Sequence, residues 1–289
     1  MTDDGPILAD STLAMAADIL DDLENVRIAN ENRLRTLTAT DEYGHGLDTT
    51  NPDIKHLFEL VADLTRAEHK AVLNLQRTMR RHPLGPFVKA HNGIGEKQAA
   101  RLLAAIRDPY WHDLHDRPRK LRELYSFCGM AVLEHGPAQP TIDSQNTGGG
   151  ATQDSDADAH GTDDSQACRG AGVAPKRQRG ATVNWSPDAR KRLWLVAAKC
   201  VMVTSSPYRE IYDKARVKYA DATHTAECKQ CGPKGNPALP GSPLSAGHQH
   251  ARAIRLIAKA ILHDLWHEAQ ELHAAHTPRD SQPTLGGVD

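Results

Sequence analysis

Apolar side chains recur at three- and four-residue steps over a long stretch near the start of the chain. Neither Gly nor Pro interrupts the stretch between Ser11 and Thr40. Its leucines share one helical face and are Leu20, Leu23, Leu34 and Leu37. This spacing predicts an amphipathic helix.

A second apolar stripe follows a connector at residues 40–53, which contains two glycines and a proline. Asp53 or Asn51 can cap the helix that begins there. The helix is expected to run to the basic cluster at 77–82, which suits the negative end of a helix, and to stop at Pro83. Its apolar positions are Leu57, Leu60 or Val61, Leu64, Ala67, Ala71 and Leu75.

These two stretches predict that residues 1–82 form a long helical hairpin or an intermolecular coiled coil. In the second case the chain is a homo-oligomer that pairs through this segment. Two ordinary core helices explain the pattern equally well.

The remaining pattern also favours helices, so the expected fold class is mainly α. Three further helical stretches are predicted at 187–203, 206–222 and 246–275. The predicted organisation is a hairpin or coiled coil at 1–82, a helix-hairpin-helix region at 83–137, a disordered acidic linker at 138–175, a basic helical region with a zinc-knuckle-like loop at 176–277, and a tail at 278–289.

The charge of the chain is strongly segregated, although its formal net value is only -2. Residues 1–24 hold seven acids and no base, and residues 138–168 hold six acids and no base. The rest carries a net +11. A basic body of this kind favours a polyanionic partner such as DNA, with RNA as an alternative.

Composition excludes several classes of protein. No run of 18 apolar residues exists, so no membrane span is expected. The five cysteines include one close pair, which is not a disulfide framework. A cytoplasmic protein is therefore expected.

A glycine, apolar residue, glycine sequence at Gly93, Ile94 and Gly95 is typical of a helix-hairpin-helix motif. Glycines allow the turn and let backbone N–H groups approach a phosphate at the positive end of the next helix. Ile94 is expected to anchor the hairpin in the core, and Lys97 to contact the phosphate directly. A plain glycine-closed helical corner is the alternative.

A run of bases after the acidic linker extends the expected DNA-binding surface. Between Arg169 and Lys218 twelve bases face three acids. Ser186 is expected to cap the helix within this run. The bases expected to contact nucleic acid are Lys176, Arg177, Arg179, Arg190 and Arg192.

Cys228 and Cys231 form a C-x2-C pair, the spacing at which two thiolates bind one Zn²⁺. Two more ligands are needed, and His248 with either His250 or His224 is favoured. A loop rich in Pro and Gly follows the pair and has little core of its own, so the zinc is expected to be structural. A cysteine pair without metal beside surface histidines is the alternative.

The order of motifs resembles the C-terminal part of transposases of the insertion-sequence 110/116/902 family. The matching pieces are VRIANENRLRTLT, GIGEKQAARLLAAIRDP, LYSFCGM, RQRGATVNWSPDARKRLWLVAAK, SPYREIYDKAR and HARAIRLIAKAILHDLW. The resemblance implies a coiled coil, a helix-hairpin-helix domain and a role in DNA transposition.

The chain also departs from that family. The resemblance implies an N-terminal nuclease domain with acidic metal ligands and a nucleophilic serine before the RQRG element. No acidic β-rich domain precedes Val26, and residues 170–179 contain no serine. We therefore expect a nucleic-acid-binding protein with no catalytic residues of its own. The alternatives are an active transposase with a displaced nucleophile or a partner nuclease domain, and a protein-interaction module.

Overall fold

The computed structural model describes residues 6–131, 183–229, 231–233 and 236–276. Within them the chain is mainly α, which confirms the predicted fold class. The linker predicted at 138–175 and the tail predicted at 278–289 lie outside the described residues. None of the described helices is both long and apolar enough to cross a membrane.

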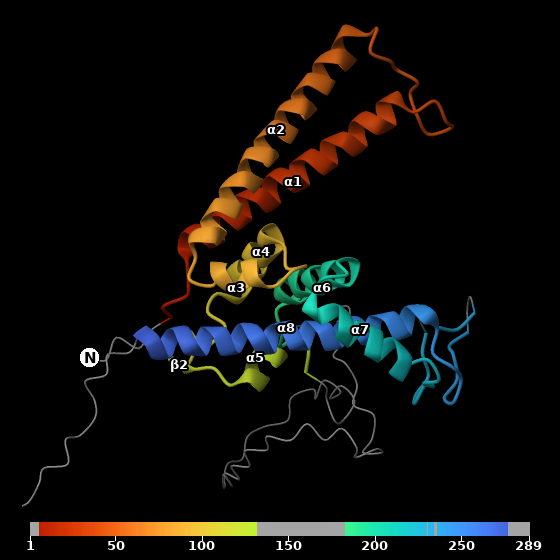
Figure 1. The fold of residues 1–289 in the computed structure, drawn as a ribbon. Coiled ribbons are helices and arrows are strands. Elements are labelled where there is room, and N and C mark those ends of the chain that lie inside the picture. Colours follow the sequence, from red (N-terminus) through yellow and green to blue (C-terminus); the bar gives the residue numbers. More distant parts are fainter. Residues whose placement is uncertain (1–5, 132–182, 230, 234–235, 277–289) are drawn as a thin grey trace, which may run out of the picture.

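The first two helices form an antiparallel stalk. Helix α1 (Ser11–Thr38) begins at Asp10, whose side chain accepts the N–H groups of Thr12 and Leu13. Helix α2 (Pro52–Arg81) begins after Asn51, whose side chain accepts the N–H of Asp53. Capping by Asn51 resolves the choice that the sequence left open. The two helices lie close together near the body and diverge toward their connecting loop (Figure 1).

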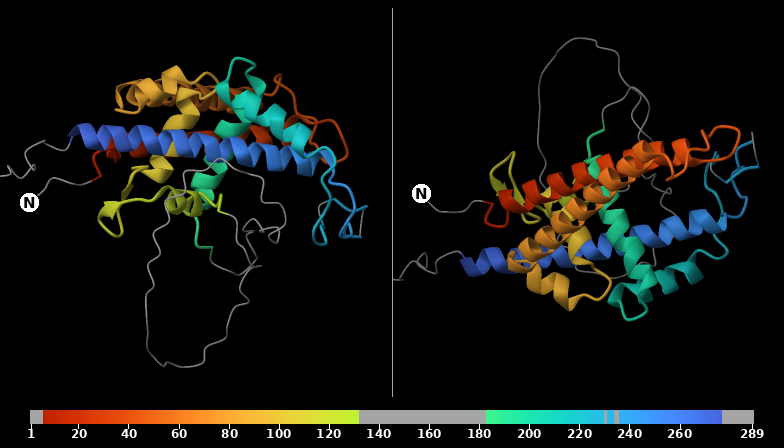
Figure 2. Two further views of the ribbon diagram at one scale, coloured as in Figure 1. Left: turned by 60° about the horizontal axis from the view of Figure 1, so that its bottom comes forward. Right: turned by 90° about the horizontal axis from the view of Figure 1, so that it is seen from above.

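The body below the stalk is built from shorter helices and one long one. Its elements are α3 (Gly85–Ala90), α4 (Glu96–Ile106), β1 (Trp111–His112), β2 (Arg117–Pro118), α5 (Leu121–Phe127), α6 (Pro187–Met202), α7 (Pro207–Lys218) and α8 (Ala246–His276). Helix α8 crosses the whole body, and α5, α6 and α7 pack against it (Figures 1 and 2). The side chain of Ser186 caps α6 as expected, by accepting the N–H of Ala189 at 3.1 Å.

One apolar core joins the stalk to the body. Leu20 of α1 and Leu75 of α2 belong to the same cluster of buried residues as Leu103 of α4, Leu193 of α6 and Ile257 of α8. The core therefore continues across the boundary expected at residue 82.

A buried ionic cluster reinforces this junction. The Arg101 guanidinium of α4 lies 2.7 Å from Asp21 and 2.6 Å from Glu24, both on α1. Arg192 of α6 also pairs with Asp21. The two arginine side chains are only 3% and 7% exposed, so these carboxylates supply the counter-charge that burial requires.

A second buried carboxylate ties the two ends of the described chain together. Asp108 is fully buried and accepts the backbone N–H groups of Leu8, Tyr110 and Trp111. The Nε2 atom of His273, near the end of α8, lies 2.8 Å from its Oδ2 atom. One side chain thus links the start of the chain, the β-hairpin and the last helix.

Removing the shared carboxylate of the first cluster should destabilise the fold. We expect Asp21→Asn to lower the free energy of unfolding by about 2–3 kcal/mol, because it leaves two buried arginines with reduced counter-charge. Urea denaturation monitored by circular dichroism measures this. Asp18→Asn, on an exposed position of the same helix, is the control and should change stability by less than about 0.5 kcal/mol. Equal effects of the two substitutions would show that the cluster contributes nothing.

Candidate metal centre and nucleic-acid interface

The loop between α7 and α8 is held by short antiparallel bridges. Thr223 pairs with Pro243, and Cys228 pairs with Ala238. Cys228 and Ala238 exchange two backbone hydrogen bonds of 2.9 Å each. The chain then turns within the C-x2-C segment, where the N–H of Cys231 donates to the carbonyl of Cys228. These bonds bring both thiols toward the first turn of α8.

Four side chains converge at this point. The ligand atoms of His224, Cys228, Cys231 and His248 all lie within 4.8 Å of one another. The Nδ1 atom of His248 is 3.3 Å from the Cys231 sulfur and 3.8 Å from the Cys228 sulfur. A set of two sulfurs and two imidazole nitrogens at these separations could hold a metal ion.

His224 provides a separate indication that the donor set fits a metal. Its side chain is buried, and its Nε2 atom has no hydrogen-bond partner among the described residues. The backbone fixes its position, since its N–H donates to Ser242 and its carbonyl accepts from Gly241. A buried ring nitrogen normally has a partner, and a metal ion would satisfy this one.

Cys231 is the more accessible of the two thiols. Burial raises its pKa, but hydrogen bonds from Ser245 and Cys228 and the positive charge of Arg252 outweigh burial, so the pKa lies below its usual value. The Ser245 hydroxyl oxygen is 3.1 Å from the sulfur. A lowered pKa favours the thiolate, which is the form that binds metal.

The two remaining histidines differ in their contacts. The Nδ1 atom of His250 lies 2.7 Å from the hydroxyl of Tyr212, in a hydrogen bond that holds the ring on the α7 side. His250 is not part of the four-residue group. Of the two alternatives that the sequence left open, His224 lies in the group and His250 does not.

The hairpin expected to bind phosphate lies between α3 and α4, and its two glycines differ in their surroundings. Ile94 is buried in the core, as expected. Gly93 has a φ of +100°, and a Cβ there would lie 3.0 Å from the Ser206 hydroxyl and 3.1 Å from the Cys200 Cα. Gly93 is therefore required for packing against the end of α6 and the start of α7.

Gly95, in contrast, faces open space that a ligand could occupy. A Cβ at this position would meet nothing within 4 Å. Gly95 is the N-cap of α4 and provides no side-chain hydrogen bond to the first-turn N–H groups. The start of α4 thus has the form that suits an anion, whereas Gly93 does not face open space.

Several bases expected to contact nucleic acid are engaged elsewhere. The Lys97 ammonium lies 3.1 Å from Glu24 of α1. Arg192 is buried and paired with Asp21, so the expectation that it lies on a binding surface is corrected. Arg190 is half-buried, with its guanidinium carbon 4.8 Å from the centre of the Trp185 ring. Lys176, Arg177 and Arg179 lie outside the described residues.

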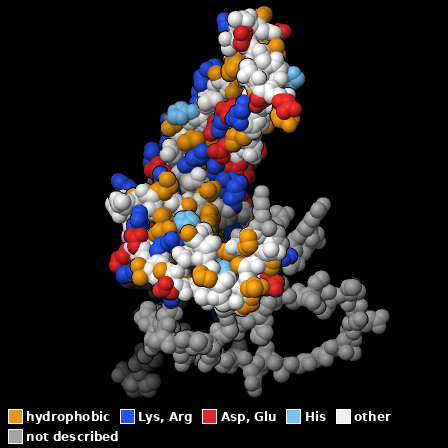
Figure 3. Space-filling view, turned by 90° about the vertical axis from the view of Figure 1, so that its right-hand side faces the viewer, with side chains coloured by type: hydrophobic (Ala, Val, Ile, Leu, Met, Phe, Trp, Pro, Cys, Tyr) orange, Lys and Arg blue, Asp and Glu red, His pale blue; other side chains and the backbone are white. Residues whose placement is uncertain are grey.

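Other bases lie near the hairpin, and the sequence pattern does not assign them to nucleic-acid binding. Arg80, at the end of α2, forms two hydrogen bonds of 2.6 and 2.7 Å with Glu96 in the first turn of α4. This contact places the end of α2 beside the open turn. Arg77, Arg81 and Lys89 are exposed on α2 and α3. Lys and Arg side chains gather along the stalk and around its base (Figure 3).

Arg77, Arg80 and Arg81 belong to the sequence cluster at residues 77–82. As a sequence pattern, this cluster indicates a charge complement to the end of a helix. Its position beside the hairpin depends on the turn at Pro83, which connects α2 to α3.

Known proteins give no independent assignment of this site. Comparison with protein families, with curated proteins and with solved structures finds no match to the chain.

Proposed function

We propose that this chain is a nucleic-acid-binding protein that contacts the DNA backbone at the start of α4 and has no strand-cleavage activity of its own. The observation that carries the proposal is the open, uncapped Gly95 turn, next to exposed bases on α2 and α3. The sequence resemblance to insertion-sequence transposases supports a role in DNA transposition, as a protein derived from such a recombinase or cooperating with one.

The chemistry of this turn suits a phosphate group. First-turn N–H groups and the positive end of the helix dipole attract an anion. Glu96 lies in the same turn, but Arg80 neutralises it. Arg77, Arg81 and Lys89 add the charge that attracts a polyanion. Contacts of this kind fix position on a duplex without reading its sequence, and RNA is the alternative ligand.

Binding to a DNA duplex should depend on the open turn and on the bases beside it. We expect Gly95→Val to weaken binding about tenfold, because the added side chain blocks the approach of a phosphate. The double substitution Arg81→Gln, Lys89→Gln should make the slope of log K against log salt shallower by roughly 1 for each lost contact. Gel-shift titration at several salt concentrations measures both effects.

Lys55→Gln is the control for this experiment. Lys55 is exposed in the first turn of α2, roughly 40 Å along that helix from Arg81, and should change binding little. A variant at Gly93 is not suitable, since a side chain there disturbs packing. Unchanged binding by Gly95→Val would refute the hairpin interface, and nicking of plasmid DNA with Mg²⁺ would refute a purely binding role.

The metal of the four-residue group is proposed to be Zn²⁺ with a structural role. Two thiolates and two imidazoles are a common tetrahedral zinc set, and four protein ligands leave no open position for catalysis. The metal would connect the loop after α7 to the first turn of α8. Because few buried apolar side chains hold this loop, the binding free energy would stabilise its fold.

Metal content tests both the zinc and the ligand set. We expect one Zn per chain by inductively coupled plasma mass spectrometry, with loss of the metal in Cys228→Ser and in His224→Ala. His250→Ala should retain the metal, because its ring is held by Tyr212. Zinc that persists in His224→Ala, or that disappears in His250→Ala, would show that the ligand set is wrong.

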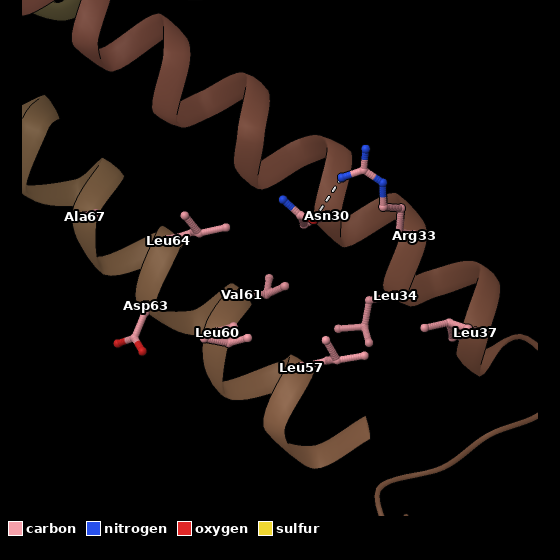
Figure 4. A pocket seen from close by; sticks show the side chains of 10 residues that line it. All are labelled: Asn30, Arg33, Leu34, Leu37, Leu57, Leu60, Val61, Asp63, Leu64 and Ala67. Atoms are coloured by element: carbon pink, nitrogen blue, oxygen red, sulfur yellow. Dashed lines mark hydrogen bonds between the residues drawn. The ribbon is translucent and has the colours of Figure 1, made fainter. Parts of the chain in front are cut away.

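The stalk is proposed to form a homodimer. Beyond the ion pair of Arg27 and Glu68, α1 and α2 separate and leave an apolar cavity of about 590 Å³. Leucines and a valine from both helices point into it (Figure 4). A second copy that packs its own stalk here would cover these apolar side chains.

The oligomeric state tests this interface. We expect the wild-type chain to sediment as a dimer, and Leu60→Glu to sediment as a monomer because it places a charge in the cavity. Leu114→Glu is the control, since Leu114 is exposed and lies outside the cavity. A wild-type monomer at micromolar concentration, by analytical ultracentrifugation, would contradict the proposal.

A further inference from the structure

The second half of helix α8 is acidic and rich in histidine. Residues 260–276 contain four histidines and no Lys or Arg. Their acids are Asp264, Glu268 and Glu271. A segment with this charge attracts cations, and its imidazoles are ligands that suit transition metals.

Two of these histidines form an exposed pair on one helical face. His263 and His267 are four positions apart, and their ring centres lie 4.4 Å apart at an interplanar angle of 63°. Both side chains are exposed. Two imidazoles at this spacing on one helix are the arrangement that binds Zn²⁺ in helical metal sites. The helix itself fixes their spacing, so binding needs no rearrangement of the backbone.

Asp264 orients the first imidazole of the pair. The Nδ1 atom of His263 lies 3.0 Å from the Oδ1 atom of Asp264. This contact leaves Nε2 of His263 as the ligand atom. A histidine that binds a metal commonly donates its other ring N–H to a carboxylate, which fixes the ring and makes it a better ligand.

The carboxylate is in turn held by a side chain from another helix. The hydroxyl of Tyr208, at the start of α7, donates to the Oδ2 atom of Asp264 at 2.9 Å. Burial and the negative charge of Asp264 raise the pKa of Tyr208, so its hydroxyl remains a donor. The Tyr208 ring is buried and stacks on His91, with 5.8 Å between ring centres. Asp264 is therefore fixed from the interior of the body.

The second imidazole rests against an anchored aromatic ring. The edge of the Trp266 ring contacts His267, with 5.1 Å between ring centres and an interplanar angle of 82°. The indole N–H of Trp266 donates to the carbonyl of Arg119 at 2.8 Å, which ties this ring to the segment after β2. Each imidazole of the pair thus has a fixed neighbour, although both are exposed.

We propose that His263 and His267 form a second metal site, which takes a divalent transition metal ion such as Zn²⁺ on the exposed face of α8. Two protein ligands leave positions open for water, so this site binds its metal more weakly than the four-residue group does. Imidazole selects such ions over Mg²⁺, which prefers oxygen ligands. The site goes beyond the proposed function, since it depends neither on nucleic-acid binding nor on the ligand set at His224.

Isothermal titration calorimetry of Zn²⁺ into the full chain, without an affinity tag, tests the site. We expect the wild type to bind one more Zn²⁺ per chain than His263→Gln, His267→Gln. Because the result is a difference between two chains, it does not depend on whether the four-residue group also binds zinc. His224→Ala should keep the additional Zn²⁺, and excess Mg²⁺ should not displace it.

Asp264→Asn tests the positioning of His263. Both imidazoles remain in this variant, but loss of the carboxylate charge should weaken binding of the additional Zn²⁺ about tenfold. Its circular dichroism spectrum without added zinc should match that of the wild type. Unchanged affinity for Zn²⁺ would show that Asp264 does not position the ligand.

The matched control is His45→Gln, His69→Gln, which removes two exposed histidines, one from the loop between α1 and α2 and one from α2. This variant should bind as much Zn²⁺ as the wild type. If His263→Gln, His267→Gln does not fold, His267→Gln alone should lose the additional Zn²⁺. The site is overturned if its variants bind as much Zn²⁺ as the wild type, if the control loses an equal amount, or if Mg²⁺ displaces the ion, as it would from an acidic patch.

Discussion

The burial of Arg101 and Arg192 beneath α1 is the constraint on which the junction of stalk and body depends. A guanidinium cannot be removed from water without a counter-charge, and Asp21 and Glu24 provide it from a single helical face. Because Arg101 belongs to α4 and Arg192 to α6, this one acidic face determines how three helices meet. The acids near the start of the chain thus include structural partners of the basic body. They also remove Lys97 and Arg192 from the set of side chains available to a polyanion.

Local signals in the sequence were sufficient to predict most of the helices. The Ser186 cap, the prolines at the helix starts and the apolar stripes mark where the long helices begin and which face is buried. The short β-hairpin and α5 were not predicted, because two-residue strands and a seven-residue helix are too short to show a periodic pattern. Charge pairing could not be predicted either. Asp21 and Arg192 are 171 positions apart, and only the packed helices bring them together.

The two candidate sites differ in how much the sequence could reveal. The C-x2-C spacing predicted two members of the four-residue group that could hold a metal ion, but it left His224 and His250 as alternatives. Only the contact of His250 with Tyr212 of α7 distinguishes them. At the hairpin, Gly93 and Gly95 had the same expected role. The structure distinguishes them, because Gly93 packs closely against Ser206 whereas Gly95 faces open space. A motif indicates where the backbone turns, whereas the tertiary surroundings decide what each residue of the motif does.

Helix α8 is the last described helix to be synthesised, and this delays the folding of the core. Its His273 completes the buried contact with Asp108, 165 positions earlier, and its Leu265 and Ile257 belong to the core shared with the stalk. The N-terminal part of the chain leaves the ribosome first, so the stalk emerges long before these partners exist. The core can close only after synthesis of the last described helix, and until then α4 exposes the apolar face that α6 later covers, and α6 exposes the face that packs against α8. Such distant contacts predict slow, cooperative folding.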